Sequence, residues 1–252
     1  MISKTKIKLI KSLSQKKFRE ETGFFIAEGS KLVLDLAPAF QCSVLAVTNE
    51  WLSELKFKAE EIIELLPDEF NKISNHKSPQ GVLAVFKKPN YNWNLQELSQ
   101  KLSLALDDVQ DPGNLGTIIR IADWFGISDI FCSEHSADAF NPKTVQATMG
   151  ALARVKVHVV NLEEFLKTCQ SYLPIYGTFM NGETIYDKNL TSNGIIVMGN
   201  EGNGISAEIE KLITERLLIP NFPLGQVTSE SLNVGVATAL VCGEFRRRKE
   251  KV

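Results

Sequence analysis

The sequence has few of the residues on which disulfide-rich, zinc-binding and histidine-dependent proteins rely. It contains 4 cysteines and 3 histidines in 252 residues, and the cysteines form no C-x-x-C pair. This spacing favours free thiols over a disulfide framework or a structural zinc site. The histidines are equally scattered, so a histidine-based catalytic triad has no support. We therefore expect no metal site, and we expect any catalysis to use other side chains.

Long apolar runs are also absent. The lysine-rich residues 1–19 lack the apolar segment of a signal peptide, and no stretch approaches the roughly 20 apolar residues of a membrane span. A composition of 44% hydrophobic and 23% charged residues is that of an ordinary soluble globular protein. We expect a cytoplasmic protein with no membrane partner.

Charge of one sign does not dominate, because the net charge is only −2. A protein that coats nucleic acid indiscriminately would be strongly basic. The positive charge is nevertheless concentrated near both ends of the chain. It falls on Lys4, Lys6, Lys8, Lys11, Lys16, Lys17 and Arg19, and on Arg246, Arg247, Arg248, Lys249 and Lys251. These residues either form solvated surface or contact the phosphates of a nucleic acid.

Residues 1–88 alternate between predicted helices and strands, which indicates a small α/β domain. A basic amphipathic helix is expected over residues 2–18, with Gly23 as its stop, and acidic helical material over residues 51–66. The expected strands cover residues 24–27, 44–47 and 81–86, and a further helix begins at Ser30 and ends before Pro38.

A polar segment with a proline, residues 87–94, marks the predicted domain boundary. Residues 89–99 are assigned to a linker and the start of the second domain, and residues 100–252 to the remainder of that domain. Its strands are expected at residues 102–106, 126–132, 155–160, 175–178, 195–198 and 217–220. Open α/β sheets bind ligands at the carboxyl edge of their parallel strands, so the loops that follow these strands are the candidate site.

The loop after residues 195–198 is rich in glycine and has the sequence Gly199-Asn200-Glu201-Gly202-Asn203-Gly204. Glycine has no Cβ, so the backbone of such a loop can approach a ligand closely, and Glu201 is its one charge. The spacing is neither the G-x-G-x-x-G dinucleotide fingerprint nor a phosphate-binding loop. A plain turn is the alternative interpretation.

Residues 115–125 form a predicted helix that is apolar on most sides, with Asn114 as its expected N-cap. Arg120 is the exception on this helix. A buried guanidinium must reach a carboxylate, a phosphate or water, because an unpaired buried charge is costly. A structural ion pair, for example with Asp123, is the alternative to a functional role.

The last predicted helix, residues 232–248, carries small residues that permit a second helix to approach closely. The helix could be buried against the sheet of its own domain, or it could form a subunit interface. The sequence leaves both interpretations open.

Three segments taken together resemble the three motifs of SpoU-type RNA 2′-O-ribose methyltransferases, which belong to the SPOUT superfamily. They are Asp111–Arg120, Met198–Ile205, and Ile219–Pro220 followed by Ser231–Val234, in the order that the family has them. Residues 16–34 also resemble the L30e-like RNA-binding domain that many members carry. The resemblance therefore covers nearly the whole chain.

The resemblance implies a fold, a cofactor and partners. The fold is α/β, with a C-terminal SPOUT domain that has a mostly parallel sheet and a trefoil knot, behind a small N-terminal L30e-like domain. The cofactor is S-adenosylmethionine, and the expected assembly is a homodimer through the catalytic domain. The implied reaction is methylation of a ribose 2′-hydroxyl of structured RNA, with ribosomal RNA preferred over transfer RNA.

The resemblance also implies roles for individual residues. Its motifs match catalytic residues at Asn114, Arg120, Glu201, Ser231 and Asn233 and cofactor-binding residues at Gly199, Ile219 and Leu232. Thr178, at the end of the preceding strand, is a further expected cofactor residue, and the basic front domain is expected to bind RNA through Lys16, Lys17 and Arg19. The link over residues 221–230 is longer than usual for the family. We expect Arg120, held by Glu201 and Asn114, to lie against the ribose and its phosphate. Arginine stays protonated, so electrostatic positioning is preferred to deprotonation as its role.

Two other functions remain open. A non-catalytic RNA-binding or ribosome-assembly protein could use the same fold, although the motif side chains are retained. A nucleotide-dependent oxidoreductase would also have glycine-rich loops, but the dinucleotide fingerprint is missing.

Overall fold

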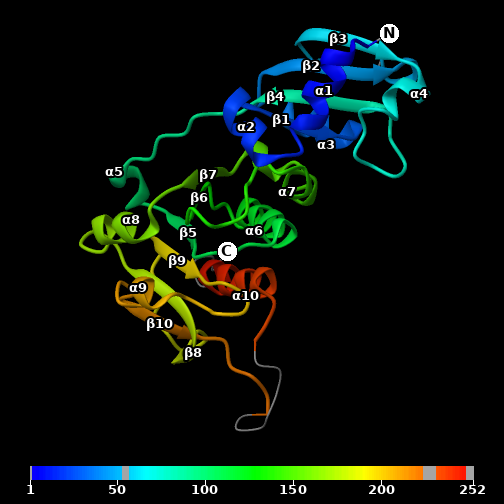
Figure 1. Cartoon of the computed structure of the whole chain (residues 1–252). Helices are drawn as coiled ribbons and strands as arrows, with labels where there is room; N and C mark the ends of the chain where they lie inside the picture. Colours follow the sequence, from blue (N-terminus) through cyan, green and yellow to red (C-terminus); the bar gives the residue numbers. More distant parts are fainter. Residues whose placement is uncertain (1, 53–56, 224–230, 248–252) are drawn as a thin grey trace. The chain divides into compact units, whose positions relative to one another are not determined.

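The computed structural model describes residues 2–52, 57–223 and 231–247. The chain forms two compact units, each with its own sheet (Figure 1). The first unit contains residues 1–90 and 138–154, and the second contains residues 91–137 and 155–252. The first unit therefore includes a segment that lies, in sequence, between two strands of the second unit.

The sheet of the first unit has the strand order β1-β4-β2-β3. Strand β4 is antiparallel to β1 and β2, whereas β3 is parallel to β2. The strands are β1 (Phe24–Glu28), β2 (Cys42–Thr48), β3 (Ala59–Leu65) and β4 (Val82–Lys87). The helices are α1 (Lys4–Ser12), α2 (Lys16–Thr22), α3 (Ser30–Leu36), α4 (Pro67–Phe70) and α7 (Pro142–Ala147), with short 3-10 helices η1 (Asn49–Trp51) and η2 (Ala151–Ala153).

Two predictions for this unit need correction. The single basic helix is instead α1 and α2, because the hydroxyls of Ser12 and Ser14 donate to the carbonyls of Leu9 and Lys11, both at 2.7 Å. Such local bonds compete with a continuous helix. The acidic helix expected over residues 51–66 is wrong, since the described part of that range contains η1 and β3. Pairing with β2 overrides the local helical preference of β3.

The sheet of the second unit has the order β10-β8-β9-β5-β6-β7, and every neighbouring pair is parallel, as predicted. The strands are β5 (Leu102–Leu106), β6 (Asp129–Cys132), β7 (Lys156–Val159), β8 (Ile175–Thr184), β9 (Gly194–Met198) and β10 (Glu215–Leu218). The helices are α5 (Leu95–Leu98), α6 (Pro112–Trp124), α8 (Leu162–Cys169), α9 (Ala207–Glu210) and α10 (Val234–Arg247). Its core packs Phe165 and Leu166 of α8 and Ile209 of α9 against the central strands.

Helix α10 packs against α6 in the second unit (Figure 1). A Cβ added to Gly235 would lie only 3.2 Å from Thr117, and one added to Gly243 would lie 3.6 Å from Phe125. Arg246 donates to the carbonyl of Phe125 at 2.7 Å, at the end of α6. The small residues of the last helix therefore serve a contact within the chain, but with α6 and not with the sheet that was expected. None of the described helices is long and apolar enough to cross a membrane.

Arg19 is a structural residue of the first unit and not a surface residue. Its side chain is 1% exposed. Its Nε and Nη2 donate to Asp138 Oδ2 at 2.9 and 2.7 Å, and its Nη1 donates to the carbonyl of Leu13 at 2.8 Å. The prediction that Arg19 binds RNA is therefore corrected, because the guanidinium has no exposed surface to offer to a phosphate. Its bonds fix α2 to the second segment of the unit.

Replacement of Arg19 by alanine should destabilise the protein. Removing one partner of a buried ion pair leaves the other charge uncompensated, so Arg19→Ala should lower the free energy of unfolding by about 3 kcal/mol. Lys17→Ala is the control, because Lys17 lies on the same helix but is exposed, and the change should stay within about 0.5 kcal/mol. Urea unfolding followed by circular dichroism measures both. Equal midpoints for the two variants would show that the pair does not hold the unit together.

Candidate active site

A tight turn follows β9 at the carboxyl edge of the parallel sheet. Asn200 and Gly204 exchange two backbone hydrogen bonds, each 2.9 Å long, and Gly204 has a φ of +71°. A Cβ added to Gly199 would lie 2.2 Å from the carbonyl carbon of Gly204. Real side chains do not approach so closely, so this turn requires glycine at position 199.

The side chain of Asn200 fixes the turn to the neighbouring strand. Its Nδ2 donates to the carbonyl of Asp108 at 2.8 Å, and its Oδ1 accepts from the backbone of Gly202 and Asn203 at 2.9 and 3.0 Å. The carboxylate of Asp107 accepts a 2.7 Å hydrogen bond from the backbone of Ser206, the N-cap of α9. The sequence predictions missed both Asn200 and Asp107, although two consecutive aspartates after a buried strand are an available signal.

Three predicted catalytic residues form one hydrogen-bonded network. Asn114 Nδ2 donates to Glu201 Oε1 at 2.7 Å, and Asn233 Nδ2 donates to Asn114 Oδ1 at 3.0 Å. Asn233 Oδ1 in turn accepts from the backbone of Gly235 and Val236 at 3.0 and 3.2 Å, at the start of α10. Each motif of the sequence contributes one member, so the fold joins the three motifs through side chains.

Asn114 does not cap its helix as predicted. Asp111 is the N-cap, and its Oδ1 accepts from the backbone of Asn114 at 2.8 Å. The helix begins one turn earlier than expected because Pro112 suits the first helical position, where no N–H is needed. This correction matters for the site, since the amide of Asn114 is released from capping and can bridge Glu201 and Asn233.

Arg120 differs from its expected environment. Its side chain is exposed, and it forms no hydrogen bond or ion pair with any residue that the structure describes, so the expected contact with Glu201 is not formed. The reason is that α6 is not apolar all round. Thr117, Arg120 and Trp124 follow helical spacing on one exposed face, and Trp124 is 85% exposed.

The predicted cofactor residues lie at the same edge of the sheet. Thr178 is half-buried in β8, with its Oγ1 4.0 Å from the sulfur of Met198 at the end of β9. Ile219 directly follows β10 and is half-buried, whereas Leu232 precedes α10 and is 50% exposed. An accessible apolar surface beside a tight glycine turn fits the adenosine part of S-adenosylmethionine. Ser231 is exposed, and the longer link lies partly outside the described residues at 224–230.

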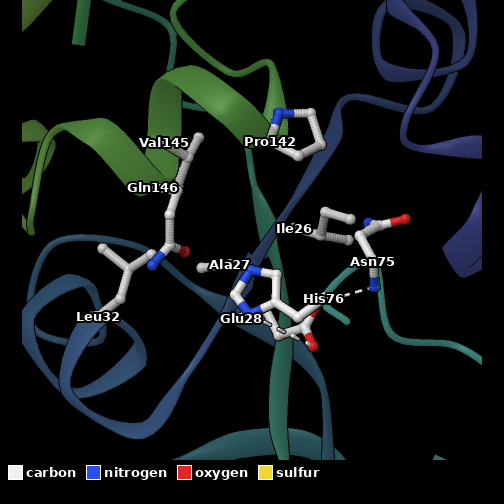
Figure 2. A pocket seen from close by; sticks show the side chains of 9 residues that line it. All are labelled: Ile26, Ala27, Glu28, Leu32, Asn75, His76, Pro142, Val145 and Gln146. Carbon is white, nitrogen blue, oxygen red and sulfur yellow. Dashed lines mark hydrogen bonds and ion pairs between the residues drawn. The ribbon is translucent and has the colours of Figure 1, made fainter. Parts of the chain in front are cut away.

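Two other kinds of site, a metal site and a ligand cavity, have little support in the described chain. No cluster of three or more His, Cys, Asp or Glu that could hold a metal ion occurs among the described residues. A cavity in the first unit contains the buried carboxylate of Glu28, which accepts hydrogen bonds from the Ser74 hydroxyl and from the Asn75 backbone, close to His76 (Figure 2). Its volume of about 20 Å³ holds roughly one water molecule and not a nucleoside.

Comparison with known proteins decides the family. Residues 101–243 match the SpoU rRNA Methylase family, and residues 4–84 match the MRM3-like substrate binding domain. The chain belongs to the SpoU rRNA methylase family. The resemblance carried by the three sequence motifs is thereby confirmed.

Relatives of this SpoU-family chain match it over almost its full length. The 23S rRNA (guanosine(2553)-2′-O)-methyltransferase RlmP of Bacillus subtilis is 30% identical, with 96% of each chain covered. A putative RNA methyltransferase of the TrmH family from Porphyromonas gingivalis superposes with a TM-score of 0.90 and 40% identity, covering 99% of this chain and 100% of the other. An AdoMet-bound rRNA methyltransferase from Sinorhizobium meliloti gives 0.86 and 28%, covering 100% and 98%.

Gly199→Ala should weaken binding of the cofactor product S-adenosylhomocysteine at least tenfold, or about 1.4 kcal/mol. The added Cβ would collide with the backbone of Gly204 and displace the turn. Gly202→Ala is a control in the same loop, because a Cβ there has its nearest contact at 3.6 Å. Isothermal titration calorimetry measures both dissociation constants. If the two variants bind equally well, the turn does not shape the cofactor site.

Proposed function

We propose that this SpoU-family chain transfers a methyl group from S-adenosylmethionine to a ribose 2′-hydroxyl of ribosomal RNA. The observation that carries the proposal is the Glu201–Asn114–Asn233 network, which gathers one residue from each motif at the carboxyl edge of the sheet. The ribosomal substrates named for the bacterial relatives support the choice of RNA. A non-catalytic protein on this fold would have no need to keep such a network.

The chemistry requires placement of a weak nucleophile. S-adenosylmethionine, when bound, supplies an activated methyl group. A ribose hydroxyl attacks such a carbon only when it is held close and in line, and when loss of its proton is assisted. The amides of Asn114 and Asn233 and the hydroxyl of Ser231 are suited to orient the ribose. The guanidinium of Arg120 is suited to stabilise the negative charge that develops on the oxygen.

RNA affinity is assigned to the first unit. Lys16 and Lys17 are exposed on α2, and their ion pairs with Glu20 and Glu21 are long, at 3.8 Å. Exposed pairs of this kind are weak, so both lysines are available to phosphates. The match of residues 4–84 to a substrate binding domain supports this assignment. A cytoplasmic location is proposed as well, by analogy with the bacterial relatives.

A homodimer is proposed through the second unit. Leu232, just before α10, is followed at intervals of four residues by Val236 and Leu240 on that helix, and each is 44–52% exposed. Trp124 on the neighbouring α6 adds a further exposed apolar side chain. Clustered exposed apolar residues of this kind are typical of subunit interfaces. The same face of α6 carries Arg120, so dimer formation and substrate contact would use adjacent surfaces.

The proposed activity is tested by methyl incorporation. Unmodified ribosomal and transfer RNA would be incubated with the protein and labelled S-adenosylmethionine, and the 2′-O-methyl positions would then be mapped. Incorporation into ribosomal RNA is the expected result. If neither RNA accepts label and calorimetry detects no S-adenosylmethionine binding, the non-catalytic alternative is favoured.

Arg120→Ala should lower turnover at least 100-fold, or about 2.7 kcal/mol, because one preorganised positive charge is lost from the transition state. The same methyl-transfer assay measures it. Lys167→Ala removes an exposed positive charge from α8 and should leave turnover unchanged. Arg120→Ala within threefold of the parent protein would contradict the assigned role.

Val236→Glu combined with Leu240→Glu should convert the dimer into a monomer, because charges would enter an apolar interface. Sedimentation equilibrium should give twice 28.1 kDa for the parent and 28.1 kDa for the variant. Leu34→Glu alters an exposed leucine of the first unit and should leave the mass doubled. A parent protein that sediments at 28.1 kDa would rule out the proposed homodimer.

A further inference from the structure

Strand β8 leaves the sheet part-way along its length. Its partner β10 pairs Arg216 with Gly177, but the next residue of β10, Leu217, pairs with Glu183. Residues 178–182 therefore have no counterpart in β10. We call these residues the β8 excursion.

The β8 excursion begins at the level of the candidate active site. Gly177, just before it, pairs with Val197, and Thr178 Oγ1 lies 4.0 Å from Met198 Sδ. Gly199 and its tight turn follow directly. The excursion thus lies at the carboxyl edge of the sheet, where the predicted cofactor residues are also found.

The guanidinium of Arg216 holds the excursion through two kinds of contact. Its Nη2 donates to Asn181 Oδ1 at 2.6 Å and its Nε donates to the Asn181 carbonyl at 3.3 Å. Its plane lies over the ring of Phe179, 3.7 Å from the centroid. The remaining nitrogen, Nη1, bonds Glu210 of α9 at 2.5 Å. One side chain therefore connects the middle of the excursion to β10 and to α9.

The excursion is also packed against the strand beneath it. A Cβ added to Gly182 would lie 2.9 Å from the carbonyl carbon of Leu217 and 3.2 Å from that of Arg216. Only glycine lets the two backbones approach so closely. With this contact at one end and Arg216 in the middle, the excursion has a defined shape.

The ion pair of Arg216 with Glu210 does not explain this arrangement. Their side chains are 35% and 43% exposed, and ion pairs with that much water contribute little to stability. The bonds to Asn181 are more specific, because a planar guanidinium can serve a backbone carbonyl and a side-chain oxygen at once. The side chain of Arg216 therefore fixes the conformation of the β8 excursion.

We propose that Arg216 is a positioning residue for cofactor binding. It holds the β8 excursion so that Thr178 and the backbone after it keep the shape that S-adenosylmethionine requires. This inference rests on the proposed cofactor location at Thr178, Gly199 and Ile219. It goes beyond that location because Arg216 lies in none of the three motifs and acts through Asn181 and Phe179.

Three variants distinguish the contacts of Arg216 with the β8 excursion from its ion pair with Glu210. Arg216→Lys keeps a positive charge for Glu210 but cannot serve both Asn181 oxygens or stack on Phe179. Asn181→Ala removes one acceptor from the excursion, and Glu210→Gln weakens only the ion pair. The dissociation constant of S-adenosylhomocysteine is measured by calorimetry, and KM for S-adenosylmethionine and kcat by methyl transfer to ribosomal RNA.

The expected result is a rise of at least fivefold in Kd and KM for Arg216→Lys and Asn181→Ala, about 1 kcal/mol, with kcat within twofold. Glu210→Gln should leave all three values within twofold. Unchanged affinity in Arg216→Lys, while Gly199→Ala weakens binding, would overturn the role of Arg216 and leave the cofactor location intact. Unchanged affinity in every variant, Gly199→Ala included, would refute the location itself. Equal losses in Glu210→Gln would show a general structural effect and also overturn the proposal.

Discussion

The candidate site depends on the hydrogen bonds of one amide, that of Asn114. It donates to Glu201 and accepts from Asn233, so it joins residues that lie 87 and 119 positions away in the sequence. A hydrogen bond to a charged group contributes roughly 1.5–3 kcal/mol, more than one between neutral groups. The orientation of the amide is therefore set before any substrate arrives. Polar groups fixed in this way need little reorganisation during a reaction, which is how preorganised sites stabilise developing charge.

This amide can bridge only because the surrounding backbone is arranged first. Asp111 takes over the capping of α6, so the side chain of Asn114 is not used by its own helix. The turn at Gly199 brings Glu201 back toward the sheet edge, and Asn200 ties that turn to the strand beside it. The parallel sheet places the ends of these strands at one edge. Local turn chemistry and sheet topology thus act together on a single hydrogen-bonded network.

The sequence predicted what depends on local order along the chain. Buried strands, glycine stops and the three motifs are short patterns, and the structure has strands at all six ranges expected for the second unit. Features that depend on distant partners were missed. Residues 59–65 have a helical composition but form a strand because β2 pairs with them. Arg19 resembles a surface cation in the sequence, because its partner Asp138 is distant along the chain. The β8 excursion could not be predicted from the sequence either, since its existence depends on the register with β10.

Three arginines of this chain illustrate how environment assigns a role to the same side chain. Arg19 is buried with all its bonds made inside the protein, and Arg216 is partly exposed but bonded to β8 and α9. Arg120 is exposed and has no partner among the described residues. It follows Asn114 by six positions on α6, about 240° around the helix, so the two side chains leave the helix in different directions. An unpaired guanidinium is well hydrated at a surface, and its attraction for a phosphate grows once water is excluded. No described residue of this chain supplies a partner for Arg120, and in the proposed function the RNA does so.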